Sequence, residues 1–468
     1  MILHMESLFG TDGIRGVANT YPIVPEVAVN VGRAVACLLK HNDRSKILIG
    51  KDPRISGDMI ENALAAGICS AGGNVSICGV LPTPAIAYLA RFMKFDAGIM
   101  VSASHNPYHD NGIKIFDKDG FKLSVEMEAK IEKEVLESAG NCIAAANDRV
   151  GTVRLENDFA ERYIDFMAHS GLMDIRLDGL KVVLDCSNGA TYAVAPQIFT
   201  RLGAIVTTLF NTPDGININE NCGSQHLGAL QKKVVETGAD VGLAFDGDGD
   251  RLIAVDEKGK PVTGDQILAI CARQMKKNGS LANNLVVSTV MSNVGLKNFL
   301  EEKDIRHIIT DVGDRLVLAE MKKSGAVIGG EDSGHMIFLD RHTSGDGILS
   351  GLRLIEVMKE TGQPLSALAG IMSVYPQVLI NVPVTKKIDI YTIPEIAETI
   401  RKVEDFLSGK GRVLVRYSGT QPLCRVMVEG PDRETTERCC REIVDVIERQ
   451  IGERQIGERH IKERPAEK

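Results

Sequence analysis

The stretch KVVLDCSNGATYAVAPQIFTRLGAIVTTLF, residues 181 to 210, places an apolar, β-like run on each side of a segment of helix length. The flanking runs KVVLD (181–185) and AIVTTLF (204–210) are rich in the β-branched residues that strands favour. The amphipathic segment APQIFTRLGA lies between them and has the pattern of a short helix. This order predicts two parallel strands joined by a helical crossover.

The order strand, helix, strand occurs three times along the chain. Each time a third apolar run follows, and a polar loop that contains glycine comes after it, so the apolar runs form three sets of three. This pattern predicts an α/β protein with three similar α/β domains whose sheets are mixed and largely parallel. The remaining runs are KILIG (46–50), NVSICGV (74–80) and DAGIMVS (96–102) in the first set, ADVGLAF (239–245) in the second, and NLVVSTV (284–290), RHIIT (306–310) and GAVIGG (325–330) in the third.

After about residue 370 the repeated order strand, helix, strand ends. GRVLVRYSGTQPLCRVMVEG (411–430) has the pattern strand, loop, strand, and a helical segment follows it, so a smaller C-terminal α+β domain is expected. The tail repeats ERQIG with a five-residue period that cannot keep one helix face, so a frayed helix or disorder is expected there. The predicted domains are residues 1–155, 156–256, 257–370 and 371–450, followed by the repetitive tail 451–468.

The composition excludes several functional classes. With 54 basic and 62 acidic residues the net charge is −8, so sequence-independent electrostatic binding of nucleic acid is not expected. The ten cysteines form no C-x-x-C pair and the start MILHMES is unlike a signal peptide, which predicts a cytoplasmic location. The uncharged stretch between Glu61 and Arg91 contains glycines and prolines, so a buried helix and strand are expected there instead of a membrane span.

Three polar loops follow the third run of each set: SASHNP (102–107), DGDGDR (246–251) and EDSGH (331–335). Ligands of open α/β sheets bind beyond the carboxyl ends of the strands. We therefore expect these loops to face one cleft.

The DGDGDR loop predicts a metal site. Asp246, Asp248 and Asp250 alternate with glycines, and several hard oxygen ligands on one turn suit Mg²⁺ or Ca²⁺, with an exposed acidic turn as the alternative. An EF-hand is disfavoured because Arg251 takes the sixth position, where that motif needs glycine, and LIAVD behind it resembles a strand. An arginine beside the aspartates fits a phosphate that binds at the same place.

Ser104 in SASHNP is a candidate nucleophile, a structural cap or the acceptor of a covalent group. No G-x-S-x-G elbow surrounds it, which disfavours a hydrolase. No G-K pair is followed by Ser or Thr, so a P-loop for ATP is absent. A divalent cation with an arginine and a lysine nearby would stabilise a phosphoserine, and its phosphoryl group would then come from a bound sugar phosphate.

A fourth polar loop is RYSGTQPLCR, residues 416 to 425. Its arginines and hydroxyl side chains predict a phosphate-binding loop, and a β-hairpin with incidental arginines is the alternative. The candidate residues are Arg416, Ser418, Gly419, Thr420 and Arg425.

Five segments together closely resemble the motifs of the α-D-phosphohexomutase family, in the same order and over nearly the whole chain. The resemblance implies four domains around a central cleft. It also implies an isomerase that moves phosphate between two positions of a hexose through a phosphoserine and a 1,6-bisphosphate. The segments are LFGTDGIRG (8–16), SASHNPYHDNGIKIF (102–116), FDGDGDR (245–251), GGEDSGH (329–335) and RYSGTQPLCRVMVEG (416–430).

The resemblance also implies roles for individual residues. Ser104 would be the phosphoserine, and one of its oxygens would share one Mg²⁺ with the three aspartates. Lys114 and His335 would carry the protons of the sugar hydroxyls, and neighbouring cations would help Lys114 to lose its proton. The remaining implied contacts are Arg15 and Arg251 at the phosphoserine, Glu331 and Ser333 at the sugar, and Arg416, Ser418, Gly419, Thr420 and Arg425 at the distal phosphate.

Within the family, TDGIRG and SASHNPYHDNGIK favour glucosamine 6-phosphate as the substrate, glucosamine 1-phosphate as the product and a hexosamine 1,6-bisphosphate as intermediate and activator. Asp332 replaces the glutamine of that branch, and Tyr417 and Gln421 replace its proline and glutamate, so mannose or glucose phosphates are the alternative substrates. A non-catalytic sugar-phosphate-binding module is the alternative from another class. The family suggests a homodimer, and no membrane partner is expected.

Overall fold

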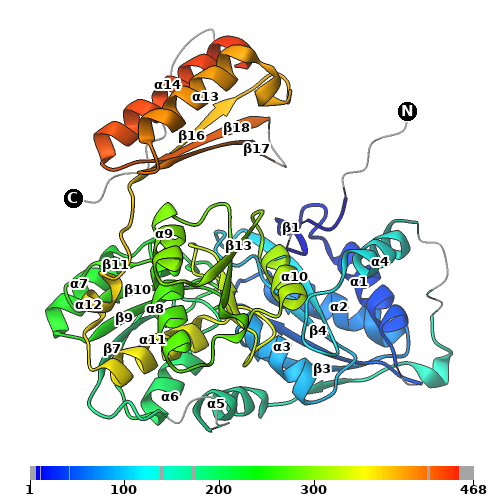
Figure 1. The fold of residues 1–468 in the computed structure, drawn as a ribbon. Helices are drawn as coiled ribbons and strands as arrows, with labels where there is room; N and C mark the ends of the chain where they lie inside the picture. The colour runs from blue at the N-terminus through cyan, green and yellow to red at the C-terminus, as the bar shows by residue number, and fades with distance from the viewer. Residues whose placement is uncertain are drawn as a thin grey trace. The chain divides into compact units, whose positions relative to one another are not determined.

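The structure, a computed structural model, describes residues 7–10, 12–41, 43–137, 142, 144–169, 175–418 and 422–452. These residues form two compact units, the first made of residues up to 291 with 305–371 and the second of residues 292–304 with those from 372 onward. Figure 1 shows the elements of both units.

The first sheet of the first unit is mixed. Strand β2 pairs in parallel with β3 and β4, and β5 returns antiparallel to β4. In spatial order the strands are β1 (Ile14–Val17), β5 (Asp110–Asp117), β4 (Ala97–Val101), β2 (Lys46–Lys51), β3 (Asn74–Val80) and β6 (Val153–Leu155). The accompanying helices are α1 (Pro25–Leu38), α2 (Gly57–Ser70), α3 (Thr83–Phe92) and α4 (Val125–Glu137).

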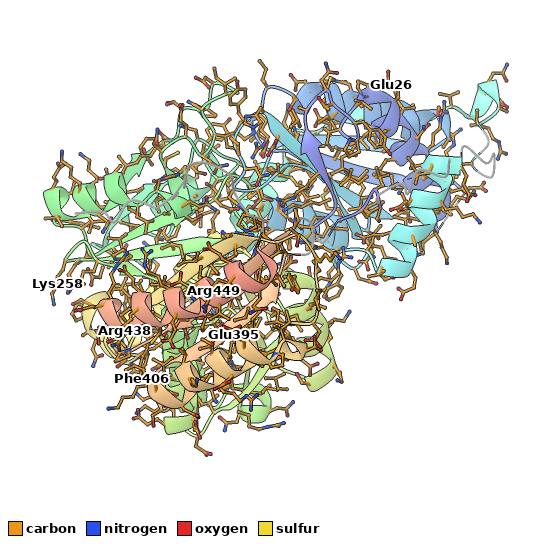
Figure 2. The ribbon with its side chains drawn as sticks, turned by 90° about the horizontal axis from the view of Figure 1, so that it is seen from above. Glu26, Lys258, Glu395, Phe406, Arg438 and Arg449 are labelled. Carbon is orange, nitrogen blue, oxygen red and sulfur yellow. The ribbon has the colours of Figure 1, made fainter. Side chains whose placement is uncertain are left out.

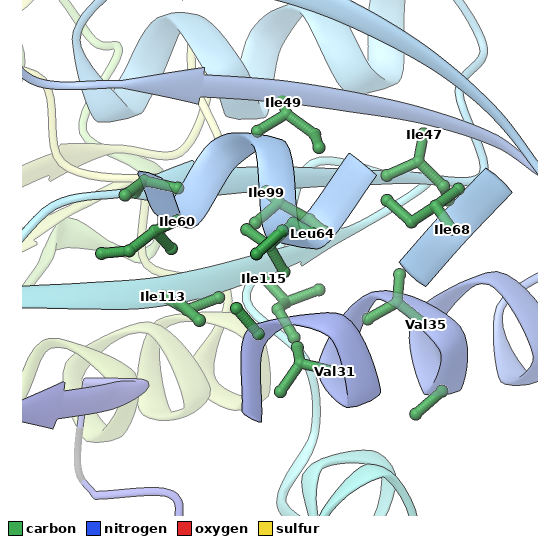
Figure 3. Packing of buried hydrophobic residues seen from close by; sticks show 14 of the residues in the cluster. Val31, Val35, Ile47, Ile49, Ile60, Leu64, Ile68, Ile99, Ile113 and Ile115 are labelled. Atoms are coloured by element: carbon green, nitrogen blue, oxygen red, sulfur yellow. The ribbon is translucent and has the colours of Figure 1, made fainter. Parts of the chain in front are cut away.

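The side chains of this sheet alternate between two buried faces, as strand geometry requires. On one face, aliphatic side chains of β2, β4 and β5 pack against α1 and α2, as Figure 3 shows for Ile47, Ile99 and Leu64. On the other face a Cβ at Gly98 would lie 3.0 Å from the Ile86 side chain, so α3 covers that side closely. Burial on both faces explains the near-continuous apolar runs in the sequence.

The second and third sheets repeat this plan. Each pairs two parallel strands with a central one and adds an antiparallel return strand. The second sheet has the order β11 (Pro261–Val262), β10 (Leu252–Asp256), β9 (Val241–Phe245), β7 (Lys181–Asp185), β8 (Ile205–Leu209), and the third has β13 (Arg306–Thr310), β12 (Leu285–Thr289), β14 (Ile328–Gly330), β15 (Met336–Phe338). The helices of these regions are α5 (Phe159–His169), α6 (Val194–Arg201), α7 (Gly228–Thr237), α8 (Gly264–Lys277), α10 (Asp314–Ser324), α11 (Gly347–Thr361) and α12 (Leu365–Ala369).

The second unit has an antiparallel sheet in the order β16 (Gln377–Pro383), β18 (Leu423–Glu429), β17 (Arg412–Tyr417). It also contains α9 (Val294–Glu302), α13 (Pro394–Leu407) and α14 (Arg433–Ile451). The helices α13 and α14 lie side by side on the sheet, and Arg438 lies over the Phe406 ring at 5.1 Å from its centroid (Figure 2).

The predicted fold class is confirmed: three similar α/β domains with mixed sheets precede a smaller C-terminal α+β domain. Every apolar run named above forms a strand, and the uncharged stretch between Glu61 and Arg91 contains a buried helix and a strand. No helix among the described residues could span a membrane. The domain boundaries stay predictions, and the tail from residue 453 lies outside the described residues.

Candidate active site

The three predicted site loops of the first unit have the same position in their sheets. Residues 102–109 connect β4 to β5, residues 246–251 connect β9 to β10, and residues 331–335 connect β14 to β15. Each loop therefore starts at the carboxyl end of a parallel strand and ends in an antiparallel one. The strand after DGDGDR also contradicts an EF-hand, which needs a helix there.

Ser104 lies where the first and second of these loops meet. Its side chain is buried, and its Oγ donates a hydrogen bond to Asp246 Oδ2 at 2.6 Å. Its backbone is left-handed, with φ of 54°, which is uncommon for a residue with a side chain. The Ser104 N–H donates to Ser102 Oγ at 2.9 Å, which helps to hold this conformation.

The three aspartates form a cluster that fits a divalent cation. One carboxylate oxygen from each of Asp246, Asp248 and Asp250 lies within 4.8 Å of the others, and all three residues are buried. The Oδ1 atoms of Asp248 and Asp250 are buried without a hydrogen-bond partner among the described residues. Burial and the two other carboxylates raise the pKa of Asp246 well above its ordinary value. A cation would satisfy the free oxygens and remove the repulsion.

Lys114 lies beside this cluster, on β5. Its Nζ lies 2.8 Å from Asp248 Oδ2, 3.1 Å from Asp12 Oδ2 and 3.5 Å from Asp250 Oδ2. Burial would lower the pKa of Lys114, but these carboxylates outweigh it and raise that pKa above its ordinary value. The expectation that neighbouring cations help Lys114 to lose its proton is therefore wrong, because its nearest charged partners are anions.

Lys114 is part of a closed ring of charged side chains. Asp12 pairs with Lys122, which also pairs with Asp314. His335 closes the ring, with Nε2 3.6 Å from Asp314 Oδ2 and Nδ1 3.6 Å from Asp250 Oδ2. Burial would lower the pKa of His335, but Asp250 and Asp314 raise it above its ordinary value. The ring joins residues of all three α/β domains.

Two glycines allow the loops to approach one another this closely. A Cβ at Gly247 would lie 2.5 Å from Ser104 O, and a Cβ at Gly334 would lie 2.2 Å from Leu252 O. Any side chain at these positions would therefore push the loops apart. Gly334 also has a left-handed φ of 92°, and its carbonyl accepts a hydrogen bond from Leu252 N at 3.0 Å.

Arg15 and Arg251 place positive charge near Ser104. Arg15 Nη1 donates to Ala103 O at 3.4 Å, and Arg251 Nε lies 3.7 Å from Asp250 Oδ1. The Nε atoms of both arginines are buried and lack hydrogen-bond partners among the described residues. Burial, followed by the charges of Arg251 and Arg15, lowers the pKa of His105 to about 4. The surroundings of Ser104 thus suit a bound anion.

The EDSGH loop contributes further polar groups. Glu331 Oε1 accepts a hydrogen bond from Gly313 N at 3.0 Å, which holds it beside the start of α10. Ser333 is exposed, so its hydroxyl is accessible. Asp332 is half-buried, and its carbonyl accepts from Gly264 N at 3.2 Å.

The fourth loop lies in the second unit. Arg416 and Arg425 are directly opposite each other on β17 and β18. Arg425 Nη2 lies 3.5 Å from Ser418 Oγ, and Lys387 Nζ donates to Ser418 O at 2.7 Å. Two like charges at facing positions repel, so this arrangement favours a bound anion. Gly419 and Thr420 lie outside the described residues.

The structure also adds charged residues that sequence reasoning missed. Asp12 belongs to the TDGIRG motif, but its position beside Lys114 had no local signal. Lys122, Asp314 and Lys387 belong to no recognised motif, because each acquires its partners only through the fold.

Comparison with protein families matches the four domains described as phosphoglucomutase/phosphomannomutase. The alpha/beta/alpha domains I, II and III match residues 6–140, 161–259 and 263–375, and the C-terminal domain matches residues 379–446.

Individual proteins agree with this match. The phosphoglucosamine mutase of Syntrophus aciditrophicus is 57% identical over 449 residues, which are 96% of this chain and 100% of that protein. The structure of a phosphoglucomutase/phosphomannomutase family protein from Burkholderia thailandensis has a TM-score of 0.77 at 25% identity, covering 95% of this chain and 97% of that one. Aspergillus fumigatus N-acetylphosphoglucosamine mutase, solved in complex with GlcNAc-6P and magnesium, has the same fold with a TM-score of 0.67 at 16% identity, covering 94% and 95%.

Proposed function

This chain belongs to the phosphoglucomutase/phosphomannomutase family and is a phosphohexomutase, and we propose that it interconverts glucosamine 6-phosphate and glucosamine 1-phosphate. The observation that carries the proposal is the hydrogen bond from Ser104 Oγ to Asp246 Oδ2 inside a buried cluster of three aspartates. A hydroxyl beside three metal-binding carboxylates and two arginines suits a group that carries phosphate.

The reaction proceeds through two phosphoryl transfers. In the first, the bond between phosphorus and Ser104 Oγ breaks while a bond between phosphorus and a free sugar hydroxyl oxygen forms, and the proton of that hydroxyl passes to His335. The product of this step is a hexosamine 1,6-bisphosphate. After this intermediate has turned around, its other phosphoryl group returns to Ser104, and the oxygen that it leaves takes up a proton. The number of phosphoryl groups on the enzyme is thus unchanged after each cycle.

Asp246, Asp248 and Asp250 would hold one Mg²⁺ together with an oxygen of the phosphorylated serine. Their two buried oxygens without partners and their mutual repulsion support this assignment. Bound there, Mg²⁺ would neutralise charge on the phosphoryl group during its transfer. Arg15 and Arg251 would contact the oxygens of the same phosphoryl group, for which the guanidinium fork is well suited.

Lys114 and His335 are the proposed proton-handling groups. Because Lys114 is held among carboxylates, it acts in its charged form, as a proton donor and as a counterion for the sugar oxygen. His335 has its two ring nitrogens beside Asp250 and Asp314, which orient the imidazole. General acid and base groups of this kind add about 10² to 10⁴ in rate.

The substrate would be held at two further places. Glu331 and Ser333 would bind sugar hydroxyls, and the arginines of the fourth loop would bind the phosphate that is not being transferred. Lys387 adds a third cation beside Ser418. A loop that contacts only the distal phosphate can bind either phosphate of the intermediate. The intermediate can therefore bind in two orientations. The full proposed set is Arg416, Ser418, Gly419, Thr420, Arg425 and Lys387.

The choice of glucosamine phosphate follows the relatives at 50% identity and above, which are named phosphoglucosamine mutase. The test compares kcat/KM on glucosamine 6-phosphate, mannose 6-phosphate and glucose 6-phosphate, each with a trace of its 1,6-bisphosphate. We expect the highest value on glucosamine 6-phosphate. A higher value on mannose or glucose phosphate would reject the proposed substrate, and binding without conversion of any of them would reject the proposed reaction. The homodimer and the cytoplasmic location stay predictions.

A further inference from the structure

The backbone of the Ser104 loop is held by side chains from two different domains. Arg54, between β2 and α2 of the first domain, donates through Nη2 to Ser104 O at 2.9 Å and to Asn106 O at 2.8 Å. Asn219, between β8 and α7 of the second domain, donates through Nδ2 to the same two carbonyls, at 2.9 and 3.0 Å. Each carbonyl therefore has two donors, which is the number of lone pairs it can offer.

The contribution of Arg54 is the more buried one. Its side chain is buried, Nη1 donates to Pro107 O and to Asp110 O, and Nε donates to Asp52 Oδ2 at 2.9 Å. These contacts lie within the first domain, so they shape the loop itself. They do not determine where the loop lies relative to the aspartates of the second domain.

Asn219 links the Ser104 loop to the second domain. It is the residue after Ile218 in a segment that belongs to the second domain, and its own N–H donates to Ser187 O at 2.9 Å in the loop after β7. Its amide thus connects the scaffold of the aspartate cluster to the carbonyl of Ser104. A shift of about 1 Å between reacting groups can cost about 100-fold in rate.

We infer that Asn219 is a positioning residue that sets Ser104 Oγ against the aspartate cluster for phosphoryl transfer. This inference rests on the proposed role of Ser104. The hydrogen bonds of the Asn219 amide go to the carbonyls of Ser104 and Asn106 and not to Ser104 Oγ, so it acts through the loop backbone. Loss of its amide should therefore slow the transfer to and from Ser104 and leave the binding of sugar phosphate nearly unchanged.

The structure offers a matched pair of variants. Asn219 has a left-handed φ of 60°, so Asn219→Gly removes the amide at a backbone conformation that glycine adopts readily. Asn221 is in the same segment with a left-handed φ of 53°, is exposed, and forms no side-chain hydrogen bond with the Ser104 loop among the described residues. Asn221→Gly is therefore the control. Asn219→Asp is a second test, because a carboxylate has the same shape but cannot donate to the two carbonyls.

The measurements are kcat and KM for glucosamine 6-phosphate with saturating glucosamine 1,6-bisphosphate, and the rate at which that bisphosphate phosphorylates Ser104, followed by intact mass. We expect Asn219→Gly and Asn219→Asp to lower kcat and the phosphorylation rate by about 10- to 100-fold, with KM changed by less than about threefold. Asn221→Gly should match the wild type in all three.

Two results would overturn the inference. One is a kcat of Asn219→Gly within about twofold of Asn221→Gly, and the other is a rise in KM with unchanged kcat, which marks lost ground-state binding. Thermal melting of each variant verifies that it is folded, and Asn219→Asp takes the place of Asn219→Gly if the glycine variant is not. Wild-type protein that neither converts the substrate nor accepts phosphate on Ser104 would instead reject the proposed function.

Discussion

Ser104 Oγ and Asp246 Oδ2 lie 2.6 Å apart although 142 positions separate them in the chain. Their contact joins the loop after β4 to the loop after β9, and it places a hydroxyl at the edge of a cluster of carboxylates. A serine with only a capping role would not need that cluster. The contact therefore favours a phosphate-carrying role for Ser104 over a capping role.

Ser104→Ala should abolish turnover of glucosamine 6-phosphate while the protein stays folded. The change removes one hydroxyl and adds no volume, so it leaves the surrounding packing intact, although it removes the hydrogen bond to Asp246. Conversion is measured with added 1,6-bisphosphate, and folding by circular dichroism. Turnover above about a hundredth of the wild-type rate would show that Ser104 does not carry the phosphoryl group, because phosphoryl transfer needs its acceptor in place.

Removal of divalent cations should both inactivate and destabilise the enzyme. A ligand present at about 100 times its Kd stabilises the folded state by about 2.7 kcal/mol, so Mg²⁺ should raise Tm measurably in protein first treated with EDTA. In Asp248→Asn the charge of the cluster falls, and the effect of Mg²⁺ on Tm should shrink. An equal Mg²⁺ effect in the variant and the wild type would place the cation elsewhere.

Lys122→Met should destabilise the first unit. The change takes from the half-buried carboxylates of Asp12 and Asp314 the cation that they share. Removal of one partner of a fully buried ion pair costs about 3 to 5 kcal/mol, and the cost here should be smaller because both carboxylates are partly exposed and keep other cationic neighbours. Calorimetric Tm is the measurement. Lys118→Met is the control, because Lys118 is exposed and forms an ion pair only with its neighbour Asp119 among the described residues. Equal Tm values for the two variants would contradict the ring as a stabilising unit.

Arg425→Ala should weaken substrate binding more than it slows the chemistry. A charge-assisted hydrogen bond contributes about 1.5 to 3 kcal/mol, so KM for glucosamine 6-phosphate should rise by about 10- to 100-fold. Arg433→Ala changes an exposed arginine that pairs with Glu437 on α14, and it should leave KM unchanged. A normal KM in Arg425→Ala would reject the phosphate-binding role of the fourth loop.

Asp346→Asn should change how stability depends on pH. Burial raises the pKa of Asp346 to about 6, against which its hydrogen bonds from Leu349 N and Tyr163 Oη act only in part. Between its unfolded pKa near 4 and about 6, the folded state retains a proton that the unfolded state has lost, so this group makes stability fall as pH rises.

The variant lacks this group, so its stability should fall less than that of the wild type as the pH rises from 4.5 to 7. The difference in the free energy of unfolding should be roughly 1 to 3 kcal/mol, and it is measured through Tm. Parallel Tm profiles of the two proteins over that range would show that the Asp346 carboxyl titrates normally.

Local patterns in the sequence were sufficient for most of the fold. The runs KVVLD and RHIIT form strands β7 and β13 with the predicted ends, because burial on both faces of a sheet leaves a continuous apolar signature. The return strands β5 and β15 were not predicted. Their residues mix polar site groups with apolar ones, as in β5, where Lys114 lies between Ile113 and Ile115.

Sequence patterns alone were enough to predict the order of the parallel strands and their crossover helices, the loops that form the site, and the residue types in each loop, since all of these depend on residues that are close in the chain. Only the folded structure shows the carboxylates around Lys114, the ring through Lys122 and Asp314, and the hydrogen bond from Asn219 to the carbonyl of Ser104. The physical reason is that electrostatic and hydrogen-bond energies depend on distance in space. Partners that are far apart in the chain acquire that distance only when the domains have packed together.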